Sequence, residues 1–271
     1  VPGNHPIADA CCIALHTPAG VVFHTGDFKL DVSPIDGKMI DLVRIGQLGE
    51  EGVKLLLCES TNAERPGFTP SERTVGLSLD RIFMENRDKR IIIATFSSNV
   101  HRVQQIINAS AKYGRRVAVV GRSMVNVIGA AVELGYMTGP DGVLIDPSET
   151  RRFKPEQLTI VTTGSQGEPM SALYRMAFSE HKQVDVGPGD RVILSSSTIP
   201  GNETTVTRVI DELVAKGAEV VYERGTDLHV SGHACQEELK MIYALTRPRY
   251  FIPVHGERRM LHTRADMIRA H

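Results

Sequence analysis

Short apolar runs alternate with amphipathic segments through the middle of the chain, and this alternation limits the fold more than any other feature. The apolar runs occupy residues 90–95, 116–120, 158–163, 192–196 and 218–222. The segments with helical spacing occupy residues 99–113, 125–134 and 202–216, and a glycine follows each of them. Strands that alternate with helices form parallel sheets, because each helix returns the chain to the same end of the sheet. We therefore predict a doubly wound α/β domain with helices on both faces of its sheet.

Start signals predict one further helix and define the beginning of another. Thr69 and Glu72 have the spacing of a capping box, with Pro70 at the first helical position, and predict a helix that ends near Asn86. Asn202 is predicted to cap the helix over residues 202–216.

The two ends of the chain differ from its middle. Near the start, apolar runs at residues 10–17 and 21–25 are separated by Pro-Ala-Gly and predict a β-hairpin, and another strand is expected at residues 54–58. Near the end we expect a helix over 236–245, a strand over 250–254 and a last helix from about 257. The chain therefore divides into three blocks, which we place at residues 1–61, 62–225 and 226–271.

The composition excludes few classes of protein. Lys and Arg number 31 and Asp and Glu number 32, so no global field attracts nucleic acid, although a local basic groove stays possible. The four cysteines lack zinc-site spacing and predict reduced core residues of a cytoplasmic protein. No apolar run has the length of a membrane helix, and no signal peptide is evident. The chain begins at Val1 rather than Met, which suggests a fragment or a processed product.

Histidine and aspartate residues near both ends predict a hydrolytic metal site. His5 lies in a polar Gly-Asn-His-Pro loop, His24 and Asp27 follow a predicted strand, and His255 follows the apolar run at 250–254. Imidazole and carboxylate are metal ligands, and sites in α/β sheets gather at the carboxyl ends of strands. Each residue alone is also compatible with an ordinary structural role, such as an aspartate that caps a turn. The fold must bring the two ends together for these residues to meet.

Serine and glycine mark candidate phosphate sites. Ser231, Gly232 and His233 combine a hydroxyl, a backbone open to close approach and an imidazole, which suits a phosphate or an oxyanion. Ser/Gly-rich turns also follow three strands of the middle region. Two of these turns contain the further candidates Ser97, Ser98, Asn99, Gly164 and Ser165. Turns of this kind favour anions at helix N-termini, but ordinary helix caps produce the same pattern.

Several of these segments together resemble one family. They read NHPIADA, HTGDFKLD, ESTNAERPGFTPSE, ATFSSNVHRVQQ, TTGSQGEP, SSSTIPGNE, HVSGHA and PVHGE. Together these sequence segments resemble the ribonuclease J group of the metallo-β-lactamase superfamily, the branch with a β-CASP insertion. The resemblance implies a partial metallo-β-lactamase αββα domain at residues 1–61 and 226–271, with a β-CASP domain at 62–225 inserted into it.

The resemblance also implies a function. The family processes and degrades RNA by endonuclease and 5′-to-3′ exonuclease action, so the expected partner is single-stranded RNA with a 5′-monophosphate, and the complete enzyme is expected to be a cytoplasmic homo-oligomer. His5, Asp27 and His255 match metal ligands, with Asp27 as the bridging carboxylate. Glu59 and His233 match catalytic residues at the scissile phosphate. Ser231 and Gly232 match part of a phosphate pocket.

One departure from the family is large. Its signature His-x-His-x-Asp-His does not occur in these 271 residues, so two divalent metals (zinc first, manganese or magnesium as alternatives) would have an incomplete ligand set. We therefore expect a chain that is inactive alone, needs the N-terminal half of the lactamase-like domain and exposes an apolar sheet face. The alternative is a β-CASP module that binds RNA or nucleotide without cleaving it. An unrelated nucleotide-binding fold is disfavoured, because GxGxxG and P-loop motifs are lacking.

Overall fold

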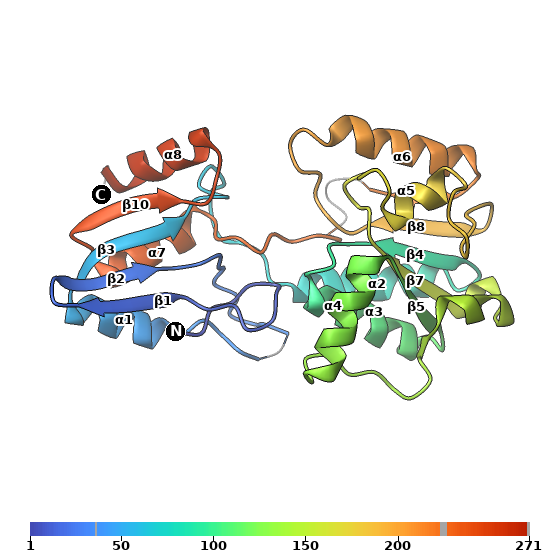
Figure 1. Ribbon diagram of the computed structural model, residues 1–271, viewed down its shortest axis with the longest axis horizontal. Helices are drawn as coiled ribbons and strands as arrows, with labels where there is room; N and C mark the ends of the chain where they lie inside the picture. Colours follow the sequence, from blue (N-terminus) through green and yellow to red (C-terminus); the bar gives the residue numbers. More distant parts are fainter. Residues whose placement is uncertain (36, 223–226, 270–271) are drawn as a thin grey trace. The chain divides into compact units, whose positions relative to one another are not determined.

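The computed structural model describes residues 1–35, 37–222 and 227–269, and the chain forms two compact units (Figure 1). The first unit contains Val1–Arg73 together with Val230–His271, and the second contains Thr74–His229. The two ends of the chain therefore fold together, as the distribution of the His and Asp residues predicts. The boundary predicted between residues 225 and 226 falls outside the described residues.

The second unit is built on a parallel six-stranded sheet with the strand order β6-β5-β7-β4-β8-β9. Its strands are β4 (Arg90–Ala94), β5 (Arg116–Val120), β6 (Leu144–Ile145), β7 (Leu158–Thr162), β8 (Asp190–Leu194) and β9 (Glu219–Val221). The central strands are apolar and rich in β-branched residues, as expected for strands covered on both faces. The predicted parallel sheet is confirmed.

Helices cover both faces of this sheet, also as predicted. They are α2 (Arg73–Glu85), α3 (Val100–Lys112), α4 (Arg122–Glu133), α5 (Ala172–Ala177) and α6 (Glu203–Ala215), with the short 3-10 turns η1 (Pro147–Arg152) and η2 (Pro155–Gln157). Figure 1 shows α5 and α6 on one face and α2, α3 and α4 on the other. The α5–α6 side packs Leu173 and Val206 against Ile92 and Val192 of the sheet.

The start of α2 was predicted wrongly. The helix begins at Arg73 instead of Pro70, and the predicted capping box does not form. The backbone N–H of Thr69 donates to Oε2 of Glu238 at 2.7 Å. The N–H of Glu72 donates to Asp31 at 3.2 Å. Distant carboxylates therefore take the donors that a local cap would have used.

The first unit has a four-stranded sheet with the order β1-β2-β3-β10. Its elements are β1 (Ile13–Thr17), β2 (Gly20–His24), α1 (Leu42–Glu51), β3 (Val53–Glu59), α7 (Gln236–Thr246), β10 (Tyr250–Val254) and α8 (Arg258–Arg269). The predicted hairpin is present as β1 and β2, and β2, β3 and β10 run parallel to one another. Helix α1 was not predicted.

Register divides the residues of this sheet between its two faces. Ala14, Phe23, Leu56 and Phe251 form one row across the strands. This row belongs to the core under α1 and α7. Side chains paired directly across strands share a face, so the neighbouring rows point the other way. Those rows are Leu15, Val22, Leu55 and Tyr250, and Ile13, His24, Leu57 and Ile252.

The second face is open to solvent in this chain. Ile13 is 62% exposed, Leu15 58%, Tyr250 54% and Ile252 47%. Contiguous apolar surface of this kind favours association. The predicted exposure of an apolar sheet face is therefore found on the side away from α1 and α7.

We expect the purified chain to self-associate through this face, and Leu15→Lys to reduce the association, because a charge in the patch opposes its burial. Sedimentation velocity over a range of concentrations measures the effect. Leu77→Lys is the matched control, since Leu77 is 75% exposed on α2 in the other unit. A chain that remains monomeric at all concentrations, or equal effects of the two substitutions, would contradict this expectation.

Two further predictions concerned membrane-spanning helices and the burial of the cysteines. Within the described residues, no helix has both the length and the apolar character needed to cross a membrane. All four cysteines are free, and three of them are buried as predicted, but Cys11 is exposed.

Candidate metal and phosphate site

The candidate residues of the first unit gather at one edge of its sheet. Strands β2, β3 and β10 are parallel, so their carboxyl ends lie together. Asp27 follows β2 after a turn, Glu59 is the last residue of β3, and His255 directly follows β10. His255 has a φ of 52°, a left-handed conformation that is uncommon outside glycine. Its carbonyl accepts a hydrogen bond from the N–H of Ser60 at 3.1 Å, which helps to hold this conformation.

A loop near the start of the chain brings His5 to the same edge. The N–H of Gly3 donates to the carbonyl of Ala10 at 2.8 Å and closes the loop. The N–H of Lys29 donates to the carbonyl of Asn4 at 2.9 Å and attaches the loop to the segment that follows Asp27. These bonds explain how the polar Asn-His-Pro sequence meets residues far along the chain.

Four of the predicted residues form a single cluster. Potential ligand atoms of His5, Asp27 and His233 all lie within 4.8 Å of one another. The Nε2 of His255 lies 3.5 Å from Oδ2 of Asp27. The ring of His233 lies between the other two imidazoles, with centroid distances of 5.4 Å to His5 and 5.3 Å to His255. The predicted convergence of both chain ends on one site is therefore present.

His24 does not join this cluster as a ligand group. Its Nδ1 accepts a hydrogen bond from the N–H of Gly26 at 2.9 Å and so shapes the turn that leads to Asp27. Gly26 adopts a φ of 61°, which glycine tolerates without strain. The predicted grouping of His24 with Asp27 thus corresponds to a structural role for the histidine.

Glu59 orients His233. Its Oε2 lies 3.0 Å from Nδ1 of His233, and its Oε1 accepts a hydrogen bond from the N–H of Phe28 at 2.7 Å. Burial lowers the pKa of His233, but the hydrogen bond and charge of Glu59 and the charge of Asp27 outweigh it, so the pKa is raised. Compared with a free histidine, the imidazolium form is therefore favoured, and in that form Nδ1–H donates to Glu59 while Nε2 carries the second N–H.

His5 has the opposite electrostatic character. Burial, together with the nearby charge of His233, lowers the pKa of His5 to about 4. Its imidazole is consequently neutral near neutral pH and keeps the lone pair that a metal needs. The N–H of Ile7 lies 3.4 Å from Nδ1 of His5, a long contact. A metal at Nε2 would place the ring proton on Nδ1 and break that contact.

This donor set fits a divalent metal. Imidazole nitrogen and carboxylate oxygen are the ligands that zinc takes in hydrolytic sites, where a catalytic zinc usually has three protein ligands. Asp27 with His5 and either neighbouring histidine reaches that number for one metal. Two metals that share Asp27 need more ligands than these residues provide.

The Ser231–His233 segment is held in place by two residues that the sequence analysis did not assign to the site. The hydroxyl of Ser231 accepts hydrogen bonds from the N–H of His233 at 3.1 Å and from Nδ2 of Asn62 at 2.9 Å. The carbonyl of His233 accepts from Asn62 at 2.8 Å and from the hydroxyl of Thr69 at 2.7 Å. Asn62 and Thr69 thus support the backbone on both sides of the imidazole. Both lie in the segment ESTNAERPGFT, where Asn62 is an unremarkable polar residue and Thr69 was predicted only to cap a helix.

Gly232 is required for the close approach of this segment to the His5 loop. A Cβ at Gly232 would lie 2.6 Å from Cδ of Pro6 and 2.9 Å from Nε2 of His5, both closer than real Cβ contacts allow. The glycine therefore lets two metal-site segments meet, independently of any phosphate.

Gly232→Ala is expected to displace the His5 loop and to weaken divalent-metal binding about 10- to 100-fold, the range typical of disturbed ligand support. Isothermal titration with zinc measures the change. Gly129→Ala is the control, because Gly129 lies inside α4 with no atom within 4 Å of an added Cβ. The control should stabilise the fold by about 0.5–1 kcal/mol and leave metal affinity unchanged. Equal metal affinity of Gly232→Ala and the unsubstituted chain would contradict the steric argument.

The remaining phosphate candidates lie in the second unit, at the carboxyl ends of β4 and β7, which are neighbours in its sheet. Ser97 is half-buried and Ser98 exposed in the turn after β4. The side chain of Asn99 accepts a hydrogen bond from the N–H of Arg102 at 3.0 Å, so it caps α3. After β7, Gly164 has a φ of 104°, and Ser165 is buried.

Gln166 connects two of these turns and was missed in the sequence. Its Nε2 donates to the hydroxyl of Ser196 at 3.0 Å and to the carbonyl of Ser197 at 2.9 Å. Its Oε1 accepts from the N–H of Ile199 at 2.8 Å. Asn202 stands at the N-cap position of α6, but its side chain makes no capping hydrogen bond, so that part of the prediction was wrong.

Comparison with known proteins identifies the family. A family model described as "Ribonuclease J, beta-CASP domain" matches residues 88–213, and one described as "Zn-dependent metallo-hydrolase RNA specificity domain" matches residues 217–271. A curated ribonuclease J from Synechocystis is 50% identical over 98% of this chain. The chain belongs to the ribonuclease J family.

Other ribonuclease J proteins are similar to the same extent. The Thermus thermophilus protein is 50% identical and the Helicobacter pylori protein (strain 26695) 48% identical, each over 94% of this chain. The chain spans 42% of the Synechocystis ribonuclease J, 44% of the Thermus ribonuclease J and 37% of the Helicobacter ribonuclease J. It therefore spans less than half the length of these relatives.

A solved structure shares the fold. The crystal structure of a protein of unknown function from Enterococcus faecalis V583 matches 94% of this chain and 57% of its own, with a TM-score of 0.64 and 19% sequence identity. The ribonuclease J β-CASP match lies within the second unit, Thr74–His229. The expected mixed α/β architecture of the metallo-β-lactamase type is confirmed by these matches together with the parallel sheets.

Proposed function

We propose that this chain supplies part of the catalytic core of a metal-dependent ribonuclease that hydrolyses RNA phosphodiester bonds. One observation carries the proposal: His233, hydrogen-bonded to Glu59, lies in one group of potential ligands with His5 and Asp27, and His255 lies against Asp27. An imidazole with a raised pKa next to a group of metal ligands suits a reaction in which a phosphate is attacked and an oxyanion leaves.

The chain's own residues have distinct parts in this proposal. A divalent metal, when bound, lowers the pKa of a coordinated water and stabilises negative charge on the phosphate. His5, Asp27 and His255 would hold the metals, with Asp27 shared between them. His233 would donate a hydrogen bond, and then a proton, from Nε2 to a phosphate oxygen or to the leaving oxygen. Glu59 would keep that imidazole protonated and oriented.

The metals are proposed to be two, with zinc preferred over manganese or magnesium. Because His5, Asp27 and His255 do not complete two sites, hydrolysis is proposed to need further ligands from a His-x-His-x-Asp-His segment. The term assembled enzyme below means this chain together with such a segment.

The other parts of the chain are assigned by the same reasoning. Residues 1–61 and 226–271 are proposed to form the lactamase-like part, and 62–225 the β-CASP domain. The turns with Ser97–Asn99 and Gly164–Ser165 are proposed to bind backbone phosphates of single-stranded RNA that begins with a 5′-monophosphate. The assembled enzyme is proposed to be a cytoplasmic homo-oligomer.

A metal and activity assay on the purified chain tests the proposal. We expect sub-stoichiometric zinc or manganese and no RNA cleavage by the chain alone, with cleavage restored when the His-x-His-x-Asp-His segment is added. Two tightly held metals in the chain alone would contradict the ligand count. RNA binding without cleavage, even after the segment is added, would favour a β-CASP module that only binds.

A further inference from the structure

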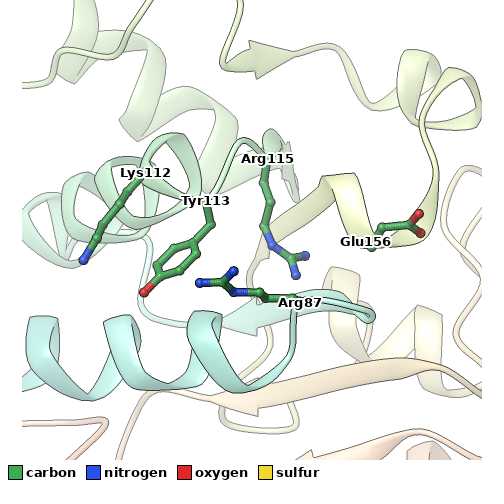
Figure 2. Close-up of a pocket in the computed structure, with 5 residues that line it drawn as sticks. All are labelled: Arg87, Lys112, Tyr113, Arg115 and Glu156. Carbon is green, nitrogen blue, oxygen red and sulfur yellow. The ribbon is translucent and has the colours of Figure 1, made fainter.

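The second unit contains a cavity of about 440 Å³ that the proposed mechanism does not use. It is lined by Arg87, Lys112, Tyr113, Arg115 and Glu156 (Figure 2). Arg87 lies just before β4, Arg115 directly before β5 and Glu156 just before β7. The cavity is therefore at the amino ends of these parallel strands, the edge of the sheet opposite to the Ser/Gly-rich turns.

Arg115 provides a fixed positive charge in this cavity. Its side chain is buried, with Nη1 donating to the carbonyls of Lys89 at 2.8 Å and Leu158 at 3.0 Å. Its Nη2 donates to the carbonyl of Asn86 at 2.6 Å. These acceptors are neutral and hold the guanidinium in place, and the carboxylates that act on its charge are Glu156 and Asp88. Glu156 lines the same cavity, but its carboxylate points away from the guanidinium groups in Figure 2.

Two further cations are arranged on one aromatic ring. The guanidinium of Arg87 lies 5.6 Å from the ring centroid of Tyr113, and the ammonium of Lys112 lies 5.4 Å from it. Lys112 also pairs with Asp80 at 2.6 Å, and the Tyr113 hydroxyl donates to the carbonyl of Asp80 at 3.3 Å. Because the ring already contacts cations, a nucleobase would have to displace them in order to stack.

We propose that this cavity binds a phosphodiester group of the RNA backbone, as a docking site separate from the turns at the other edge of the sheet. The lining holds three cations and one carboxylate, although Lys112 already pairs with Asp80 and Asp88 acts on Arg115 from outside the lining. The guanidinium groups of Arg87 and Arg115 favour an anionic ligand, because they match phosphate oxygens in geometry. The inference rests on the proposed function, because it takes RNA as the substrate.

The test is RNA binding by the full chain with the double substitution Arg87→Gln and Lys112→Gln. Both side chains are exposed and Arg115 is left in place, so the fold should persist, and circular dichroism checks this. Fluorescence anisotropy with a single-stranded RNA is measured over a range of salt concentrations. For each RNA phosphate that the variant no longer neutralises, the slope of log K against log salt should become less negative by about 0.7, and binding should weaken about five-fold near 0.1 M salt.

The matched control is Arg208→Gln with Lys182→Gln, which removes the same charge from the second unit. Arg208 is also an exposed arginine over an aromatic ring, 4.9 Å from the centroid of Phe178, but it lies on α6, on the other face of the sheet. The site would be supported if the control kept its RNA affinity and salt dependence, while the Arg87/Lys112 variant bound RNA more weakly and with a less steep salt dependence.

The remaining outcomes separate this inference from the proposed function. Equal losses of affinity in the two variants would show a general charge effect and overturn the site. RNA binding that is unaffected by Arg87→Gln and Lys112→Gln would also overturn it, while leaving the ribonuclease proposal intact. If the unsubstituted chain bound no RNA, the choice of RNA as substrate would itself fail. Binding of polyglutamate in place of RNA, abolished by the same substitutions, would assign the cavity to an acidic protein segment instead.

Discussion

Replacing His233 with alanine is expected to slow RNA cleavage by the assembled enzyme about 10²- to 10⁴-fold, the range for loss of a general acid. The expectation follows from the raised pKa of His233 and from its place beside His5 and His255. Metal binding should change little, because His5, Asp27 and His255 stay in place. Single-turnover cleavage of a labelled RNA, with metal content measured in parallel, gives both quantities.

The control for this result is a double-mutant cycle that combines His233→Ala with Glu59→Gln. Glu59→Gln keeps an oxygen for the N–H of Phe28 but removes a charge that raises the pKa of His233. Alone, this substitution should reduce the cleavage rate about 10- to 100-fold. The loss of activity at alkaline pH should also begin at a lower pH, since the pKa of His233 falls. In the His233→Ala background, Glu59→Gln should reduce the cleavage rate almost no further. Full additivity would show that Glu59 does not act through His233, and cleavage unchanged by His233→Ala would remove the residue from the mechanism.

The largest effect on stability is expected from Glu238→Ala. This carboxylate is fully buried, and its Oε1 accepts from the N–H of Leu30 at 2.7 Å. Its Oε2 accepts from the N–H groups of Thr69 and Cys235, each at 2.7 Å. Removing the carboxylate leaves three buried N–H donors without this acceptor, and such donors cost about 1–3 kcal/mol each. We expect a loss of about 3–5 kcal/mol in the free energy of unfolding of the first unit.

Urea unfolding followed by circular dichroism measures this loss. Glu237→Ala is the matched control, because Glu237 is the preceding residue of α7 and its side chain is 44% exposed in a pair with Lys240. That change should alter stability by less than about 1 kcal/mol. A Glu238→Ala chain that is as stable as the control would mean that the three donors find other partners, and the bridging role would have to be abandoned.

The architecture of the second unit could be predicted because its signals are local. Apolar runs such as the one at residues 90–95 and glycines such as Gly114 mark each strand and helix end without reference to distant residues. The hairpin at the start was predictable for the same reason. Pro-Ala-Gly lies between two apolar runs, and Gly20 takes a φ of 120° at the turn.

Elements that depend on distant contacts could not be predicted. Helix α1 contains Gly46 and Gly49, which lower helix propensity. A Cβ at Gly49 would lie 2.0 Å from the carbonyl oxygen of Leu245, so this glycine allows α1 and α7 to approach closely. The start of α2 was wrong for a similar reason, because Glu238 and Asp31 take the donors of the expected capping box.

The candidate site was likewise predictable only in part. His5, Asp27 and His255 were found because imidazoles and a carboxylate stood in loops or at strand ends, and the structure brings them together with His233. The residues that support them, such as Asn62, carry no chemical signal in a single sequence. Their role depends on backbone carbonyls, like that of His233, which only the fold places nearby.

Anomalous diffraction at the zinc edge, on crystals of the assembled enzyme, would show which residues hold the metals. We expect two metal peaks that share Asp27, one bonded to His5 and the other to His255, at about 2.0–2.2 Å from the ligand atoms. His233 should lie outside both coordination spheres, with its Nδ1 still on Glu59. A metal bonded directly to His233, or no metal at Asp27, would contradict the assignment of His233 to the phosphate and of its neighbours to the metals.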